Sequence, residues 1–544
     1  MNSSSGIDSL GSSPKAMRLS YWGAFAVLAS IASVSFWLFS RFTVDDAFIT
    51  WRYGKNLIDS GVWGYNPTSF DLTQAYTNPV YAALGIIPHL LGVDVVLFFK
   101  MVSVLLVSVF AVWFSRRTKA GIFVALLYAV PATFIHAFSG LETFLYVILL
   151  TALFIFVLEE KFWSVHACAV LLFMTRPESW AFLGLIPMFY FLPKALDDDF
   201  KCGRLKSVVL GAFDFRSYNY KMGFLSFFIL AIPLLTYFYF HKLHFGYAMP
   251  NTFYVKSGGA FNPFNFVYFS LSAMPILIFL GAFRLRAFLV AFLFFGAVIV
   301  SYSTSSLAMN YVDRFAFHIV VPAYLMLVYV AAKLLGGNFY VSFDPSLKNI
   351  KEISYKSLSF FAAFVFISFF GLKTLAPSSL VHIANYYPRA LDSHASLGKA
   401  INEDSASYGF EAMSFGDAGM TAYHSGLASL DNIGLGSSLV AQIGVSEKTI
   451  SDYDPAVVVF HARPEGIRLD DYSQDTLYSW VKTEGYSHVC QVYWKPNYTL
   501  NIYSKYQLNS VLNVCESSKS KNDVKDKSYF LKQGSVPPWY YWHT

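Results

Sequence analysis

Charged residues are scarce in this sequence, where they make up 14% of the 544 positions. A soluble globular protein usually has about a quarter, so the shortage excludes an ordinary soluble fold for the chain as a whole. Hydrophobic residues make up 55% and aromatic residues 19%. An aromatic content this high suits a protein with two lipid–water interfaces to anchor. We therefore expect a polytopic α-helical membrane protein.

Three further features are missing. The sequence has no glycine-rich fingerprint of a dinucleotide-binding fold, so nothing indicates a nucleotide ligand. His136, His244 and His318 have no metal-ligand spacing, and we interpret them as structural. The net charge of +6 does not indicate nucleic acid, because the basic residues lie in short loops between apolar runs, where they orient helices.

Apolar runs of about 20 residues recur over the first 375 positions, and each is long enough to cross the hydrocarbon core as a helix. Basic clusters between them alternate without conflict if they face the cytoplasm. The first run is longer than a usual signal-peptide core, so we expect it to be retained. We predict about eleven transmembrane helices, with the N-terminus inside and the C-terminus outside. The spans are 20–40, 95–115, 120–138, 142–158, 162–176, 178–193, 222–241, 264–282, 287–302, 317–335 and 357–374.

Two regions remain outside these spans. The first outer loop runs from 41 to 94, and its segment 79–91 is too short to span and is predicted to be a juxtamembrane helix on the outer surface. Polar residues return from 375 onward, and segments 455–461 and 488–495 are typical of short strands. We predict a membrane module at 1–374 and an extracytoplasmic α/β domain at 375–544. Cys490 and Cys515 fall in this domain, and a disulfide between them stays open.

Distinctive polar clusters gather on the outer side in the predicted topology. A transporter would scatter polar residues through helix middles, whereas these lie at helix ends. The pattern favours a site at the outer membrane surface. The clusters are Asp45–Asp46, "YTNP" (76–79), "SGLET" (139–143), "TRPES" (175–179), "HFGYAMPNTFYVKSG" (244–258) and "NYVDRF" (310–315).

The stretch "TVDDAFITWRYGKNLIDSG" (43–61) opens the first outer loop. Asp45 suits the N-cap of a helix, and an apolar stripe follows at helical spacing. We expect this helix to lie along the membrane. Capping alone would explain one acid, whereas two adjacent acids favour a catalytic role. The stripe consists of Ala47, Trp51, Gly54 and Ile58.

The same stretch, continued through "AYTNPVY", resembles the first outer loop of the GT-C glycosyltransferases. It is most similar to the mycobacterial terminal arabinofuranosyltransferase family and its bacterial relatives. "SGLET", "RPE", "FGYAMPNTFYVKSG", "YVDRF" and "GDAGMTAYHSGLASLDNIGL" (416–435) recur in the same order, so the resemblance covers nearly the whole chain. Relatives often carry acids where this chain has Thr73 and Gln74, which leaves the donor and acceptor sugars open.

The resemblance implies a GT-C-like membrane glycosyltransferase of the bacterial cytoplasmic membrane. It would transfer a sugar, arabinofuranose or another pentose, from a polyprenyl phosphate to a cell-envelope glycan or glycoconjugate on the outer side. The implied partners are the lipid-linked donor, the glycan acceptor and the bilayer, without nucleic acid. A divalent cation (Mg, Mn or Ca) stays open.

The resemblance also implies the roles of single residues. Asp45 or Asp46 would be the general base for the acceptor hydroxyl, with slightly more weight on Asp45 because relatives centre the site on the first acid. Arg176, Lys256 and Arg314 would meet the charge of the leaving phosphate, and Arg52 would join them if its helix turns inward. Further substrate-binding candidates are Tyr76, Glu142, Glu178 and Asp313.

Structural roles compete with these assignments. Glu142 also suits a helix start, Arg176 and Glu178 suit an internal ion pair, and Asp313 could pair with Arg314. "GDAG" (416–419) fits a strand and turn better than a phosphate loop.

Two other functions remain open for the chain as a whole. One is a lipid or polysaccharide transporter, with functional polar residues at mid-helix. The other is a non-catalytic glycan-binding receptor, in which Asp45 and Asp46 would be dispensable.

Overall fold

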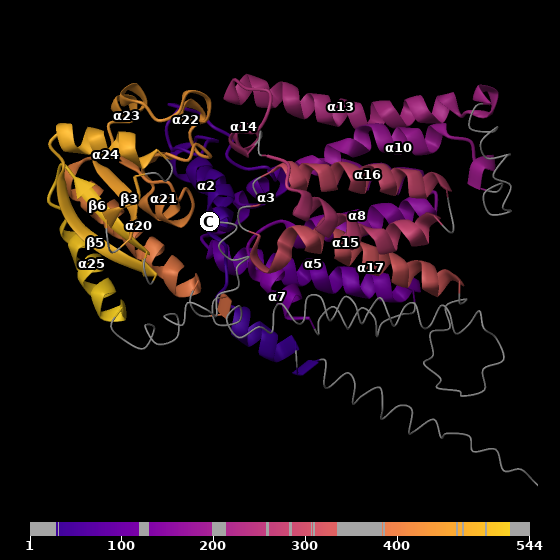
Figure 1. Cartoon of the computed structure of the whole chain (residues 1–544), viewed down its shortest axis with the longest axis horizontal. Coiled ribbons are helices and arrows are strands. Elements are labelled where there is room, and N and C mark those ends of the chain that lie inside the picture. The colour runs from indigo at the N-terminus through magenta and orange to yellow at the C-terminus, as the bar shows by residue number, and fades with distance from the viewer. Residues whose placement is uncertain are drawn as a thin grey trace, which may run out of the picture.

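The structure is a computed structural model. It describes residues 29–118, 130–197, 214–256, 260–334 and 383–522, apart from 31, 282–284, 306, 308–309, 385–386, 464–465, 470–472 and 496–497. A layer of long, roughly parallel helices forms one part, and a sheet covered by helices forms the other (Figure 1). Helices α2 and α3 lie between the two parts, so the predicted first outer loop is at their junction.

The helical part follows the apolar runs of the sequence. The long runs at 95–115, 222–241, 287–302 and 317–335 all form helices within a few residues of the predicted bounds. The elements are α2 (Asp45–Ser60), α3 (Pro79–Leu84), α4 (Ile86–Leu91), α5 (Val95–Thr118), α7 (Pro131–Phe138), α8 (Thr143–Leu158), α9 (Phe162–Phe173), η1 (Pro177–Ala181), α10 (Phe182–Phe191), η2 (Phe215–Ser217), α13 (Tyr220–Phe245), α14 (Asn251–Lys256), α15 (Pro263–Gly281), α16 (Leu285–Thr304), η3 (Tyr311–Asp313) and α17 (Arg314–Leu334).

Four helices among the described residues are long and apolar enough to cross a membrane: α5, α13, α16 and a span from Tyr311 to Val330. A fifth arises if α7 and α8, which meet at 112°, form one bent span. Large apolar side chains are exposed along α5 and α13, including Leu105 at 63% and Leu235 at 65%. Such faces suit lipid rather than water, so the chain is a multi-pass membrane protein.

The predicted number of eleven spans is not reached within the described residues. Spans 20–40, 120–138 and 357–374 lie wholly or partly outside them. Spans 162–176 and 178–193 are shorter than predicted, because α9 ends at Phe173 and α10 begins at Phe182. Pro177 starts the 3₁₀ turn between them, and a proline cannot supply the backbone N–H that a continuous helix needs.

Basic and acidic side chains meet at one end of the helical layer. Arg117 donates to Glu159 at 2.9 Å, and Arg286 pairs with Asp197 at 2.9 Å and with Glu160 at 3.0 Å. Glu142 precedes α8 and Glu159 follows it, so the 16-residue helix separates them by roughly 24 Å. The basic loops and the polar motifs therefore occupy opposite ends of the bundle.

The remaining part is a mixed sheet with helices. The strand order is β2-β1-β3-β6-β5, with β4 paired to β3; β1 is parallel to β2 and β3, while β6 is antiparallel to β3 and β5. The elements are α20 (Tyr387–Tyr408), β1 (Ala412–Ser414), α21 (Met420–Ser425), β2 (Ala428–Leu430), α22 (Ser438–Ile443), α23 (Glu447–Tyr453), β3 (Val457–Arg463), β4 (Gly466–Ile467), α24 (Gln474–Thr483), β5 (Ser487–Lys495), β6 (Tyr498–Ser504) and α25 (Asn509–Asn522).

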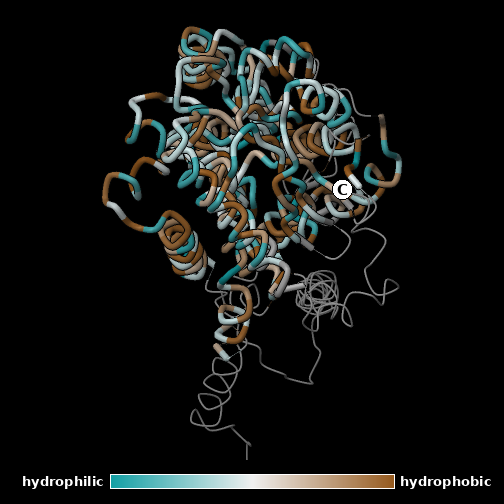
Figure 2. Tube along the Cα trace, turned by 90° about the vertical axis from the view of Figure 1, so that its left-hand side faces the viewer, coloured by the Kyte–Doolittle hydropathy of each residue, from teal (hydrophilic) through white to brown (hydrophobic). Residues whose placement is uncertain are grey.

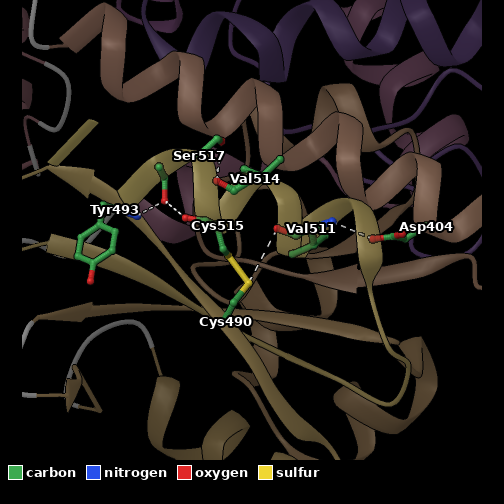
Figure 3. The surroundings of a disulfide bond; sticks show 8 residues. Asp404, Cys490, Tyr493, Val511, Val514, Cys515 and Ser517 are labelled. Atoms are coloured by element: carbon green, nitrogen blue, oxygen red, sulfur yellow. Dashed lines mark hydrogen bonds between the residues drawn. A yellow bond between two sulfur atoms is a disulfide. The ribbon is translucent and has the colours of Figure 1, made fainter. Parts of the chain in front are cut away.

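The two strands predicted in this part correspond to β3 and β5. Viewed end-on from this side, hydrophilic and hydrophobic residues are mixed along its chain (Figure 2). A disulfide joins Cys490 on β5 to Cys515 on α25 (Figure 3). The bridge settles the alternative that the sequence left open, and it fastens α25 over the sheet.

Candidate functional site

Helix α2 carries the two adjacent acids, and its start differs from the prediction. The N-cap residue is Val44, and no side chain caps the first turn. Asp45 and Asp46 are both helical residues of that turn. The predicted capping role of Asp45 in its own helix is therefore wrong, and its carboxylate is available to other partners.

The apolar stripe of α2 is buried in protein along most of its length. Ala47 and Trp51 are fully buried, and the Trp51 ring stacks on Phe99 at 4.9 Å. Gly54 touches the backbone of Gly85, where a Cβ would lie 2.3 Å from the carbonyl oxygen. The helix is held between the helical bundle and the sheet part.

Two of the sequence motifs, "SGLET" and "TRPES", meet at Arg176. Its guanidinium contacts Glu142 at 2.6 Å and Glu178 at 2.7 Å. Glu142 occupies the N-cap position of α8, but its side chain makes no capping bond there. The ion pair between Arg176 and Glu178 that the sequence left as an alternative is present. With only 7% of Arg176 exposed, the two carboxylates occupy this guanidinium.

A polar chain connects this ion network to α2. Thr50 donates to Asn78 at 3.2 Å, and Asn78 donates to Glu142 at 2.8 Å. Both are buried. Asn78 belongs to the "YTNP" motif, but only Tyr76 of that motif was predicted from the sequence to be a site residue. Membership of the motif was the one sequence feature that pointed to Asn78. We call Thr50, Asn78, Glu142, Arg176 and Glu178 the Arg176 network.

Arg314 begins α17 after a strained approach. Val312 and Asp313 both have positive φ, 49° and 53°. A left-handed conformation is unfavourable for a β-branched residue such as valine, and strain of this kind concentrates at functional sites. Asn310 accepts the N–H of Phe315 at 3.1 Å, which fixes the turn into the helix.

The Arg314 guanidinium differs from those of Arg52 and Arg176. It lies over the Phe315 ring at 4.9 Å and makes no hydrogen bond or ion pair with any residue that the structure describes. The alternative pairing with Asp313 is absent from this part of the chain, and Tyr268 bonds Asp313 instead. Arg314 is in electrostatic range of Asp46 and Glu142.

Asp45 and Asp46 have different surroundings. Asp45 is 7% exposed, and its two oxygens accept the N–H groups of Gly419 at 3.1 Å and Met420 at 2.8 Å. Asp46 is half-buried and in electrostatic range of Arg314 and Tyr387. The "GDAG" motif is a turn between β1 and α21, and it binds a protein carboxylate.

The remaining predicted residues are Arg52, Tyr76 and Lys256. Arg52 is 1% exposed and donates to the carbonyls of Tyr65, at 2.6 Å, and Leu427. Tyr76 is buried and accepts from the Trp63 indole at 3.2 Å. Lys256 is the last residue of α14. Arg52 therefore joins α2 to the sheet part, and its buried guanidinium faces protein carbonyls.

Further polar bonds hold the first outer loop to the sheet part. Tyr65 donates to the Ala418 carbonyl at 2.7 Å. Asp71 accepts from Ser437 and Tyr453, each at 2.6 Å. We call these contacts, with those of Asp45 and Arg52, the docking interface. Sequence spacing gives no sign of the contacts between the loop and the sheet part, because these join residues more than 350 positions apart.

Two buried carboxyls, of which Asp45 belongs to this interface, make the stability of the fold sensitive to pH. Burial and the nearby Asp417 raise the pKa of Asp45 to about 8, and burial raises the pKa of Asp431 to about 7. The folded state thus retains protons that the unfolded chain releases above about pH 4. Stability should fall as pH rises from about 4 to about 8, by up to ~1.4 kcal/mol per pH unit for each group. Thermal unfolding in detergent at pH 5, 6.5 and 8 measures this slope. Asp45→Asn should make the slope shallower, and parallel curves would contradict the assignment.

No protein-family model and no curated protein matches the chain. Among solved structures, it is similar to ArnT from Cupriavidus metallidurans bound to undecaprenyl phosphate, with 13% identity over 88% of this chain and 98% of that chain and a TM-score of 0.49. It is also similar to ArnT from the same organism in the apo state, with 14% identity over 91% and 99% of the two chains and a TM-score of 0.47.

Proposed function

We propose that this protein is a membrane glycosyltransferase of the GT-C type that takes a sugar from a polyprenyl phosphate. The observation that carries the proposal is the Arg314 guanidinium, which has no partner among the described residues and lies in electrostatic range of Asp46. A cation and a carboxylate at the junction of apolar helices with a polar domain are the two groups that this reaction needs.

Arg314 supports the phosphate half of the reaction. The bond between the sugar and the phosphate oxygen breaks, and the departing polyprenyl phosphate gains negative charge. A preorganised cation stabilises such developing charge, and a guanidinium matches phosphate geometry with two parallel N–H bonds. Arg176 cannot supply this without losing its two glutamates, and Arg52 is 1% exposed and already binds two backbone carbonyls.

Asp46 supports the acceptor half. The acceptor hydroxyl attacks the sugar carbon, and its proton must pass to a base within hydrogen-bond reach. Both oxygens of Asp45 are occupied by backbone N–H groups, so we assign the proton to Asp46. The described residues hold no group of three or more His, Cys, Asp or Glu side chains suited to a metal, and no step of the proposed reaction is routed through a divalent cation.

The membrane position of the donor fits the surroundings of this site. The exposed apolar faces of α5 and α13 suit lipid, where a polyprenyl chain would remain during the reaction. The ordered motifs favour arabinofuranose or another pentose as the sugar and a cell-envelope glycan as the acceptor. They also favour an outward-facing site, with residues 375–544 on the outer side of the bacterial cytoplasmic membrane.

Arg314→Ala should weaken binding of the donor headgroup. Loss of a charged hydrogen bond costs about 1.5–3 kcal/mol, so affinity for undecaprenyl phosphate in nanodiscs should fall ~10–150-fold. Lys256→Ala tests the second cation in the same assay. Arg41→Ala is the matched control, because Arg41 is exposed and pairs with Asp392. Unchanged affinity in both Arg314→Ala and Lys256→Ala would overturn the proposal.

A further inference from the structure

We propose that Asp45 is a positioning residue: it binds the turn before α21 and thereby fixes the direction in which Asp46 faces. This inference rests on the function proposed above, in which Asp46 takes the proton. It assigns the sheet part of the chain a role in building the site, because the backbone that Asp45 binds belongs to that part.

The contact between Asp45 and the turn uses both carboxylate oxygens. Oδ2 accepts the N–H of Gly419 at 3.1 Å and Oδ1 accepts the N–H of Met420 at 2.8 Å. Two bonds to the two oxygens of one carboxyl group define its orientation as well as its position. The backbone N–H of Asp45 also donates to the Tyr387 hydroxyl at 3.2 Å, so main chain and side chain are both held.

Gly419 permits this approach. A Cβ at this position would lie 2.2 Å from Oδ2 of Asp45 and 2.3 Å from its carbonyl oxygen. Contacts this short are not tolerated, and the neighbouring atoms are a held carboxylate and backbone. The turn can therefore reach α2 only because residue 419 has no side chain.

The geometry of α2 transmits this contact to Asp46. Successive side chains of a helix are about 100° apart, so the direction of Asp45 determines that of Asp46. Arg52 lies seven residues after Asp45 on the same face and binds the sheet part through Leu427. Thr50 lies four residues after Asp46 and binds Asn78 of the Arg176 network. One face of α2 thus docks on the sheet part, and the other faces the bundle.

The two faces explain why adjacent acids differ in role. Asp45 turns toward Gly419, and Asp46 is left in range of Arg314 and Tyr387. If the docking contact is lost, the first turn of α2 can rotate or fray. A displacement of about 1 Å at a reacting group can slow a reaction ~10²-fold, although the group itself is intact.

The test compares Asp45→Ala, Asp45→Asn and Gly419→Ala in the purified full chain. The probe donor is decaprenyl phosphate carrying arabinofuranose, and release of decaprenyl phosphate measures turnover. Asp45→Ala and Gly419→Ala should each lower turnover ~10–100-fold. Affinity for undecaprenyl phosphate should stay within about twofold of the parent. The rate should still fall at acid pH, because Asp46 remains the base. Asp45→Asn retains one acceptor and should lose less.

A double variant and a control complete the design. Because Asp45→Ala and Gly419→Ala remove the same contact, the double variant should be no slower than the worse single variant. Gly184→Ala is the matched control, since a Cβ there meets nothing within 4 Å, and it should behave as the parent. Faster hydrogen exchange at residues 420–425 in both single variants would verify that the contact is lost.

Two results would overturn the inference. One is turnover at the parental rate in Gly419→Ala with the exchange at 420–425 increased. The other is loss of the acid limb of the pH–rate profile in Asp45→Asn, which would make Asp45 the base. Should Gly419→Ala not fold, Asp45→Asn alone decides through its pH profile. Failure of the proposed function is distinguishable, because Arg314→Ala would then bind phosphate normally and the parent would not turn over the probe donor.

Discussion

Asp46→Asn should reduce sugar transfer by roughly 10²–10⁴-fold, the usual contribution of a general base. The amide keeps the shape of the side chain and its place in the first turn of α2, but it cannot accept the acceptor's proton. Binding of undecaprenyl phosphate should persist or tighten, because the substitution removes a negative charge in range of Arg314. Turnover of the purified variant, with headgroup affinity measured in parallel, checks both expectations.

A matched acid on the same helix provides the control. Asp59 pairs with Lys55 at 3.0 Å, and its side chain is 56% exposed, so Asp59→Asn makes the same chemical change away from Arg314. It should transfer at the parental rate. Parental turnover by Asp46→Asn, or an equal loss in Asp59→Asn, would remove Asp46 from the chemistry.

The helical part was predictable because its signal is local. The composition of each long apolar run is enough to predict the helix that it forms. Examples are α5 (Val95–Thr118) and α13 (Tyr220–Phe245). The short pair around Pro177 was harder to predict, since its helices have only 12 and 10 residues and a five-residue 3₁₀ turn lies between them. The first and last residues of a helix depend on tertiary packing, which the local hydrophobicity of the sequence does not predict.

The site was predictable as a set of motifs but not as a set of roles. "YTNP", "SGLET" and "RPE" do meet in space, through Asn78, Glu142 and Arg176. Whether an arginine is free to bind substrate depends on its neighbours, however, and those come from distant segments. Arg176 is occupied by two glutamates, whereas Arg314 has no such partner among the described residues.

The docking interface was also not predictable from the sequence, because its contacts join distant segments of the chain. Asp45 and Gly419 are 374 positions apart, and neither has a local pattern that predicts the other. An aspartate at the start of a helix favours an N-cap on statistical grounds, and that expectation failed because a backbone turn from the sheet part supplies better-placed donors. Long-range contacts of this kind become visible only once the fold is known.

Arg176→Met should be strongly destabilising, more so than Arg314→Ala or either aspartate variant. The change leaves Glu142 and Glu178 buried without their common partner, and their side chains are only 5% and 9% exposed. Breaking a buried ion network by removing one member costs about 3–5 kcal/mol. The thermal unfolding midpoint in detergent should fall sharply, and the yield of folded protein with it.

The triple variant Arg176→Met, Glu142→Gln, Glu178→Gln separates stability from substrate binding. It removes all three charges together, so no uncompensated charge stays buried, and the midpoint should recover most of the loss. Undecaprenyl phosphate affinity should equal that of the parent, because Arg176 is occupied by the two glutamates and Arg314 remains. A triple variant that is stable but has lost phosphate affinity would show that Arg176 contacts the donor, and the network would then belong to the binding site itself.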